Sequence, residues 1–381
     1  MPIARTDWTK RGAARLRLNK LRNPILPFVL ALSFSTSCFA WGTKEHILLT
    51  RLAAEGLIAD PKTPQEMKDW LRKAAPDLRD LEGEKRFLLE ARIGVYPRGA
   101  DGLSFWSVVP DLNRAADGQG DRARMVRPFD VPEGSLHYID LEFFYPIDAQ
   151  RSYADDLSHK PAFKDVPRDM GDPRWKRSGM LPFRVEQCYR DMVDQLRKGR
   201  LLDTPGQYPR DEHAQMWAGM LAHYAEDNTQ PQHATADYMS ASYFKALFRG
   251  PNVHLDVESR LIDDEMDDFT GLRREFWDEF ARALQEVTDP VDTDDPWAAT
   301  VQVALASYDA LPLIGHAAAA AYSHEPEGWK FDAAAFYHFK GTYHGKEITV
   351  MQMKADQMAW AVKRVQRLWR KAWDDAHAGQ H

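Results

Sequence analysis

The stretch HYAEDNTQPQHATADY, residues 223 to 238, holds the densest group of potential ligand side chains in this sequence. His223 and Asp227 are four residues apart, so on a helix they lie on one face about one turn from each other. Pro231 lacks a backbone donor and cannot continue that helix. We therefore expect the helix to end or kink near Pro231, and the chain to turn His233 back toward His223 and Asp227.

A second pair with the same spacing follows in NVHLDVESRL, where His254 and Glu258 are four residues apart. Imidazoles and carboxylates at these spacings suit a cation such as zinc, which binds nitrogen and oxygen ligands at about 2.0 to 2.2 Å. A histidine followed by an acid four residues later is also a common ion pair on a helix surface. Each pair taken alone allows that simpler interpretation.

Helical patterns dominate the rest of the sequence. Thr63, Pro64 and Glu66 form a capping-box start, and Asp295-Pro296 opens another helix in the same way. Residues 349 to 376 repeat apolar side chains at spacings of three, four or seven, which predicts a long amphipathic helix. We expect this stripe to pack in the core, and its members are Met351, Met358, Val362, Val365, Trp369 and Trp373.

Residues 96 to 180 follow a different pattern. Pro, Gly and Asp recur there with little periodicity, which predicts a long irregular excursion from a helical scaffold. A flexible surface insertion is the alternative. Because no alternating apolar run is long enough to predict a sheet, we expect an all-α fold. It would be a single large helical domain, residues 41 to 381, with a long irregular insertion.

The first forty residues have the order of a secretory signal. Seven Lys and Arg side chains and a single Asp accompany an apolar run from Ile25 to Leu32, and Cys38 and Ala40 place small side chains before a cleavage site. This predicts cleavage after Ala40 and a periplasmic or secreted protein that begins at Trp41. The apolar run is shorter than the roughly 20 residues of a membrane-spanning helix. No transmembrane anchor is expected after cleavage, although an uncleaved anchor is the alternative.

Removing the signal makes the chain more acidic. The first forty residues carry a net charge of +6, so the formal charge of −7 becomes −13 over the remaining 341 residues. Such a chain gains little from counterion release on a nucleic acid, and we expect no stable nucleic-acid complex. A nuclease with metal cations in its site is not excluded, because the metals supply local positive charge. Cys188 is the single cysteine left, so no internal disulfide can form.

The stretch HYAEDNTQPQHA resembles the H-x3-D-x5-H motif of the zinc-dependent phospholipase C and single-strand-specific nuclease superfamily, including the QP before the last histidine. The LHYID segment around His137 is similar to a second family segment. The resemblance implies a trinuclear zinc site that uses the amino nitrogen and the carbonyl oxygen of an N-terminal tryptophan. Trp41 and His46 match that role, and only cleavage after Ala40 creates the free amine.

The resemblance implies three sets of metal ligands, in which Asp227 belongs to two. The first set is Asp101, His137, His223 and Asp227. The second set is His233, His254 and Glu258. The third set is Trp41, His46 and Asp227. As a ligand, Asp101 would also accept a proton from the attacking water.

The assignment of Asp101 departs from the family pattern. Asp101 precedes His137 by 36 residues, which is farther than usual, and an insertion over residues 105 to 128 would account for the difference. Asp111 and Asp121 are the alternative ligands. The Gly99 to Asp101 segment, GAD, resembles the family context and favours Asp101. The nuclease branch tends to carry an arginine three residues after this aspartate, whereas Ser104 stands there in this chain.

The resemblance therefore implies a zinc-dependent phosphodiester hydrolase, in which a metal-activated water attacks a phosphate ester. A phospholipase C-like activity on a phospholipid is favoured, because Ser104 replaces the arginine, Glu258 closes the second set and the chain is acidic. The spacing of five from Trp41 to His46 favours the alternative, a single-strand-specific nuclease that releases nucleotides. An alternative of another class is a zinc-stabilised binding protein without turnover.

Overall fold

A computed structural model of the chain describes residues 41–75, 102–115, 131–145, 160–202, 212–244, 250–258, 260–262 and 270–378, with the backbone alone at 113–115 and 270. The chain divides after Ser37, and all of these residues belong to the part from Cys38 to His381. Helices dominate this part, which confirms the prediction of an all-α fold.

The α-helices in the described residues are α1 (Thr43–Ala59), α2 (Gln65–Ala74), α4 (Gly102–Ala115), α5 (Trp175–Ser178), α6 (Leu181–Arg197), α7 (Ala214–Asp227), α8 (Val253–Glu258), α9 (Thr270–Glu286), α10 (Pro296–Tyr308), α11 (Leu311–Ala321), α12 (Ala333–Tyr337) and α13 (Val350–His377). Short 3-10 turns join them: η1 (Glu133–Leu136), η2 (Leu141–Phe144), η4 (Phe163–Asp165), η5 (Pro231–Ala234) and η6 (Ala241–Tyr243).

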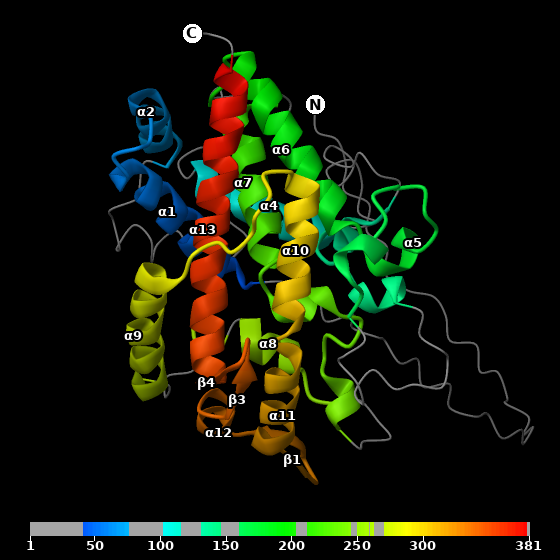
Figure 1. Cartoon of the computed structure of the whole chain (residues 1–381). Helices are drawn as coiled ribbons and strands as arrows, with labels where there is room; N and C mark the ends of the chain where they lie inside the picture. Colours follow the sequence, from blue (N-terminus) through cyan, green and yellow to red (C-terminus); the bar gives the residue numbers. More distant parts are fainter. Residues whose placement is uncertain are drawn as a thin grey trace, which may run out of the picture. The chain divides into compact units, whose positions relative to one another are not determined.

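Helix α7 lies at the centre of the fold. Every residue of α7 is buried, and the helix packs against α1, α4, α6 and α13 (Figure 1). A Cβ atom on Gly219 would lie only 2.4 Å from Cβ of Trp106, so the glycine allows α4 to approach α7 closely. The polar C-terminal turn of α7, which carries His223 and Asp227, is thereby enclosed between helices.

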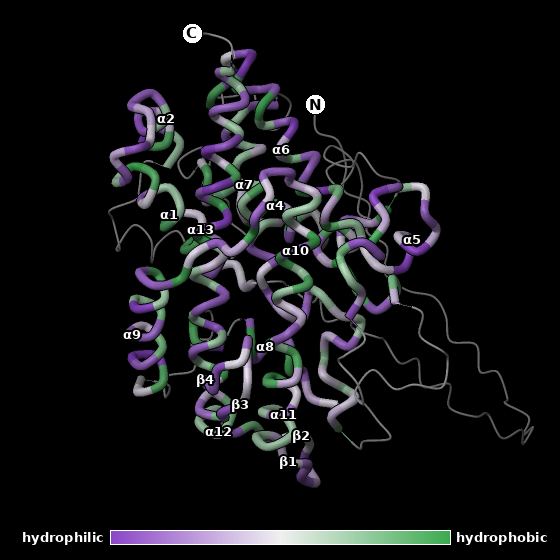
Figure 2. The backbone as a smooth tube through the Cα atoms, viewed as in Figure 1, coloured by the Kyte–Doolittle hydropathy of each residue, from purple (hydrophilic) through white to green (hydrophobic). Residues whose placement is uncertain are grey.

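Helix α13 confirms the predicted amphipathic helix and its core stripe. All six apolar side chains predicted to face the core are at most 5% exposed. Figure 2 shows hydrophobic and hydrophilic residues alternating along α13, as expected for a helix with one face in the core. The helix contacts α1, α6, α7 and α9, so this C-terminal helix packs against segments from the start and the middle of the described chain.

The two predicted helix starts have different outcomes. At α10, Asp295 accepts a hydrogen bond from the backbone N–H of Ala298 at 2.9 Å and Pro296 occupies the first turn, as predicted. At α2, no side chain caps the helix, so the predicted capping box is wrong. The hydroxyl of Thr63 instead accepts a hydrogen bond from Arg370 of α13, because a tertiary contact replaces the local one.

The predicted irregular insertion over 105 to 128 is wrong for its first part. Residues 102 to 115 form α4, which contains Pro110 and is buried along most of its length. The helix forms despite this proline because its apolar face packs on α7. Residues 116 to 128 lie outside the described residues. Farther along, residues 131–145 and 160–180 consist of turns and very short helices, in agreement with the irregular pattern.

Two short hairpins were not predicted. β1 (Tyr322–Glu325) pairs antiparallel with β2 (Gly328–Phe331), and β3 (Lys340–Tyr343) with β4 (Lys346–Thr349). Among the described residues, the segment Pro296–Ala321 is long and apolar enough to cross a membrane by length and composition, and 61% of its most apolar window is buried in the protein. Such burial is typical of a core helix.

Candidate metal centre

The last turn of α7 places His223 and Asp227 on one face of the helix. Nε2 of His223 lies 3.2 Å from Oδ2 of Asp227, and both side chains are fully buried. The predicted spacing of four residues is therefore realised inside the protein. The alternative of a surface ion pair does not apply to this pair, because neither side chain is exposed.

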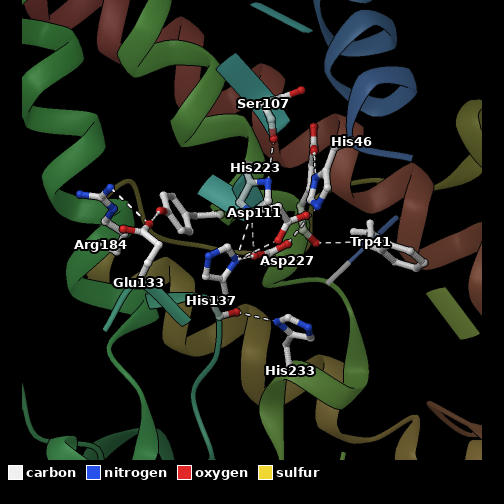
Figure 3. Close-up of polar contacts among 12 residues, drawn as sticks. Trp41, His46, Ser107, Asp111, Glu133, His137, Arg184, His223, Asp227 and His233 are labelled. Atoms are coloured by element: carbon white, nitrogen blue, oxygen red, sulfur yellow. Dashed lines mark hydrogen bonds and ion pairs between the residues drawn. The ribbon is translucent and has the colours of Figure 1, made fainter. Parts of the chain in front are cut away.

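The two carboxylate oxygens of Asp227 face different histidines. Oδ1 lies 3.3 Å from Nε2 of His46, which comes from the first turn of α1. Oδ2 lies 2.9 Å from Nδ1 of His137, which follows η1. Figure 3 shows these side chains converging on Asp227 from separate elements. This arrangement suits a carboxylate that bridges two cations.

Three histidines are anchored through Nδ1. The ring of His223 donates from Nδ1 to the carbonyl of Ser107 at 2.7 Å, and the ring of His233 donates from Nδ1 to the carbonyl of His137 at 2.6 Å. Nδ1 of His46 lies 2.7 Å from a carboxylate oxygen of Glu226. Since carbonyl oxygens can only accept, Nδ1 of His223 and of His233 carries a proton, and in the neutral ring Nε2 keeps its lone pair.

These tautomers direct nitrogen lone pairs at carboxylate oxygens. Nε2 of His233 lies 3.6 Å from Oε1 of Glu258, and Nε2 of His223 lies 3.2 Å from Oδ2 of Asp227. Two groups that both offer electron pairs repel each other unless a proton or a metal cation lies between them. Histidines that bind metals commonly donate their other ring N–H to a carbonyl or a carboxylate. The donor set therefore fits metal ions.

The second predicted set also comes together. His233 on η5 and His254 and Glu258 on α8 are buried, and their ligand atoms lie within 4.8 Å of one another. Helix α7 ends at Asp227, before Pro231, as predicted, but the expected return of His233 to His223 and Asp227 is wrong. His233 joins His254 and Glu258 and not the His223 pair, but the hydrogen bond to the carbonyl of His137 connects the two sets.

The aspartate beside His137 and His223 in the structure is Asp111, the first of the two alternatives. Asp111 lies on α4, is 2% exposed and has ligand atoms within 4.8 Å of those of His137 and His223. Asp101 and Asp121 lie outside the described residues. The sequence analysis favoured Asp101 because the GAD segment resembles the family context. The position of Asp111 near His223 depends on the packing of α4 on α7, which local spacing does not show.

An exchange of Asp111 for Asn is expected to lower the bound metal by about one equivalent, because an amide offers a weaker ligand than a carboxylate. The matched variant Asp101→Asn is expected to keep all of its metal. Both contents can be measured by elemental analysis after dialysis against a metal buffer. Normal metal content in Asp111→Asn together with a loss in Asp101→Asn would restore the original assignment.

Trp41 is fully buried beside this centre. Its indole N–H donates to the backbone carbonyl of Glu226 at 2.8 Å (Figure 3). Glu226 precedes Asp227, so the hydrogen bond holds Trp41 next to the residue that faces both His46 and His137. The large apolar side chain at the predicted N-terminus is thus a core residue that anchors the start of α1.

Sequence reasoning missed the residues that support the ligands. Glu226 contacts His46. The position of Glu226 next to Asp227 in the motif could have indicated this role. Glu133 accepts a hydrogen bond from Tyr224 and lies 3.6 Å from the buried guanidinium of Arg184. The ring of Tyr224 in turn meets the edges of the His137 and His223 rings. No local pattern connects Glu133 and Arg184, because their contact exists only in the folded chain.

Glu142 supports the segment after His233. Its carboxylate accepts hydrogen bonds from the hydroxyls of Thr235 and Tyr308, the latter at 2.9 Å, and from the backbone N–H of Ala236. Burial raises the pKa of Glu142, and these hydrogen bonds oppose the rise. Burial, together with the charge of Glu142, raises the pKa of Asp140 to about 8.

Burial of so many acids requires compensation. Asp111, Glu226, Asp227 and Glu258 are each at most 2% exposed. Burial, with a smaller contribution from the charge of Asp227, raises the pKa of Glu226 well above its usual value, while a hydrogen bond from Thr50 lowers it. Buried carboxylates are costly unless cations or hydrogen bonds compensate them. Metal ions between these groups would supply that compensation.

Comparisons of the chain with protein-family models, with curated proteins and with solved structures found no match. Within the described residues, the groups that could each hold a metal ion are His46, His223 and Asp227; Asp111, His137 and His223; and His233, His254 and Glu258. The chain thus contains buried histidine and carboxylate clusters that are suited to cations.

Proposed function

We propose that this chain is an exported, zinc-dependent phosphodiester hydrolase with a trinuclear centre. The observation that carries the proposal is the position of Asp227, whose oxygens face His46 on one side and His137 with His223 on the other. A single-ion structural site has no need for such a bridging carboxylate. The second set lies next to it, connected through the carbonyl of His137.

In this proposal Asp111, His137, His223 and Asp227 would hold the first ion. His233, His254 and Glu258 would hold the second. His46, Asp227 and the amino nitrogen and carbonyl oxygen of Trp41 would hold the third. Nitrogen and oxygen donors of this kind suit zinc. Since the second set supplies only three protein ligands, it leaves room for water or substrate, as catalytic zinc sites do.

Bound divalent cations would stabilise negative charge on phosphate oxygens and lower the pKa of water at the site. The side chains and carbonyls of the protein would orient the ligands and accept the proton. The carbonyls of Ser107 and His137 fix the rings of His223 and His233, so that Nε2 is available in each. Asp111 takes the role that the sequence assigned to Asp101, accepting a proton from the attacking water.

Phospholipid remains the first candidate substrate, because Glu258 contacts His254 as expected for the phospholipase branch and the chain is acidic. A specific observation favours the nuclease as second candidate. With Asp111 as the ligand, the residue three positions later is Arg114 on α4 and not Ser104. The missing arginine, which had argued against a nuclease, is then present in the sequence.

An assay of protein that begins at Trp41 tests both candidates. Zinc-loaded protein is incubated with phosphatidylcholine vesicles and, separately, with single-stranded RNA, with a chelator control. We expect chelator-sensitive release of phosphocholine, whereas nucleotide release would identify the second candidate. If metals bind and neither substrate is cleaved, the result contradicts hydrolysis of these substrates and favours a zinc-stabilised binding protein.

A further inference from the structure

Glu226 makes an unusual set of contacts with the start of α1. Its carboxylate lies 2.7 Å from Nδ1 of His46 through Oε2, and accepts a hydrogen bond from the hydroxyl of Thr50 at 2.9 Å through Oε1. Its backbone carbonyl accepts hydrogen bonds from the indole of Trp41 at 2.8 Å and from the hydroxyl of Thr229 at 2.9 Å. One residue of α7 therefore holds two candidate ligands, His46 on α1 and Trp41 just before it.

Packing alone does not account for this acid. Glu226 is fully buried at the end of a helix whose other core positions are mostly apolar. An uncompensated buried carboxylate is costly, and an apolar side chain of similar volume is often better for stability. The two carboxylate oxygens of Glu226 instead contact His46 and Thr50, which lie one turn apart on α1. The carboxylate thus fixes the rotation of α1 as well as the ring of His46.

The ring of His46 lies between two acids. With Nδ1 held at Glu226, Nε2 is directed at Oδ1 of Asp227, 3.3 Å away. With a cation between Nε2 and Asp227, this would be the order carboxylate, histidine, metal, in which the outer carboxylate sets the tautomer and raises the basicity of the ligand nitrogen. Loss of such an outer partner typically weakens metal binding by about 10 to 100-fold.

We propose that Glu226 is a positioning residue for the third metal, acting through His46. The inference rests on the proposed trinuclear centre, and it adds a residue that binds no metal itself. The side chain of Glu226 contacts residues of α1. The second set of ligands is held elsewhere, because His233 donates to the carbonyl of His137 and Glu258 lies on α8. The effect of Glu226 is therefore selective for the third metal and leaves the second set intact.

The test uses Glu226→Gln, which keeps the size of the side chain but removes its charge, in protein that begins at Trp41. Zinc affinity and stoichiometry are measured by titration against a competing chelator dye. We expect one equivalent to bind about 10 to 100-fold more weakly, with the other two unchanged. Thr50→Val removes one hydrogen bond to the carboxylate and is expected to weaken zinc binding at the same site by a smaller factor. This second variant tests the inference if Glu226→Gln folds poorly.

A double variant shows whether Glu226 acts through His46. In the His46→Ala background, Glu226→Gln is expected to cause no further loss of zinc, whereas a general structural role would add a second loss. Wild-type affinity for all three ions in Glu226→Gln overturns this inference and leaves the proposed function standing. Failure of the wild-type protein to bind three ions overturns the proposed centre itself.

Discussion

If the proposed centre is correct, replacing Asp227 with Asn is expected to remove two of its three zinc equivalents and to lower the proposed hydrolysis by about a thousandfold or more, since bound metal ions contribute several kcal/mol to catalysis. The reason is the two-sided position of the carboxylate, with Oδ1 beside His46 and Oδ2 beside His137 and His223. An amide presents one neutral oxygen and an NH2 group that cannot bind a cation. A single substitution should therefore affect two sets of ligands.

Elemental analysis of purified protein measures this effect directly. Glu258→Gln is the matched control, because it makes the same chemical change in the second set and should remove only one equivalent. Helical content, followed by circular dichroism, shows whether each variant is folded. Loss of only one equivalent in Asp227→Asn would show that this carboxylate does not bridge.

An additional Met before Trp41 is expected to abolish binding of the third ion and to lower activity by about a hundredfold or more, because loss of one metal removes several kcal/mol of stabilisation. The added residue converts the free amine into an amide nitrogen, whose lone pair is delocalised into the carbonyl group and binds a metal poorly. The carbonyl of Trp41 remains, but the chelate formed by amine and carbonyl is lost. Zinc stoichiometry and hydrolysis are compared with those of protein that begins at Trp41.

Trp41→Phe at the N-terminus is the control for the terminal amine. This variant keeps the amine and the carbonyl but loses the indole hydrogen bond to Glu226, which measures 2.8 Å. It should keep the third ion, with reduced affinity, so the amine and the indole are tested separately. Full activity and three bound ions in the Met-extended protein would rule out the terminal chelate.

Much of the helical scaffold could be predicted because its signals are local. The apolar stripe of α13 repeats with the period of a helix, and Asp295 and Pro296 mark the start of α10. Helix α4 was missed because the surrounding Pro, Gly and Asp residues suggested irregular structure, while its helical form depends on α7. The hairpins were missed because their strands have four residues each, too few for a periodic pattern.

The sequence by itself determined which pairs share a helix face. His223 with Asp227, and His254 with Glu258, are four residues apart, and the period of the helix brings such residues together whatever surrounds them. The tertiary structure alone decided how the pairs combine. The contact of His46 with Glu226 spans 180 residues, that of His223 with Ser107 spans 116, and that of His233 with His137 spans 96. These contacts depend on how α1, α4 and α7 pack. That packing results from the burial of apolar side chains throughout the core, and it cannot be predicted from the spacing of residues within one segment.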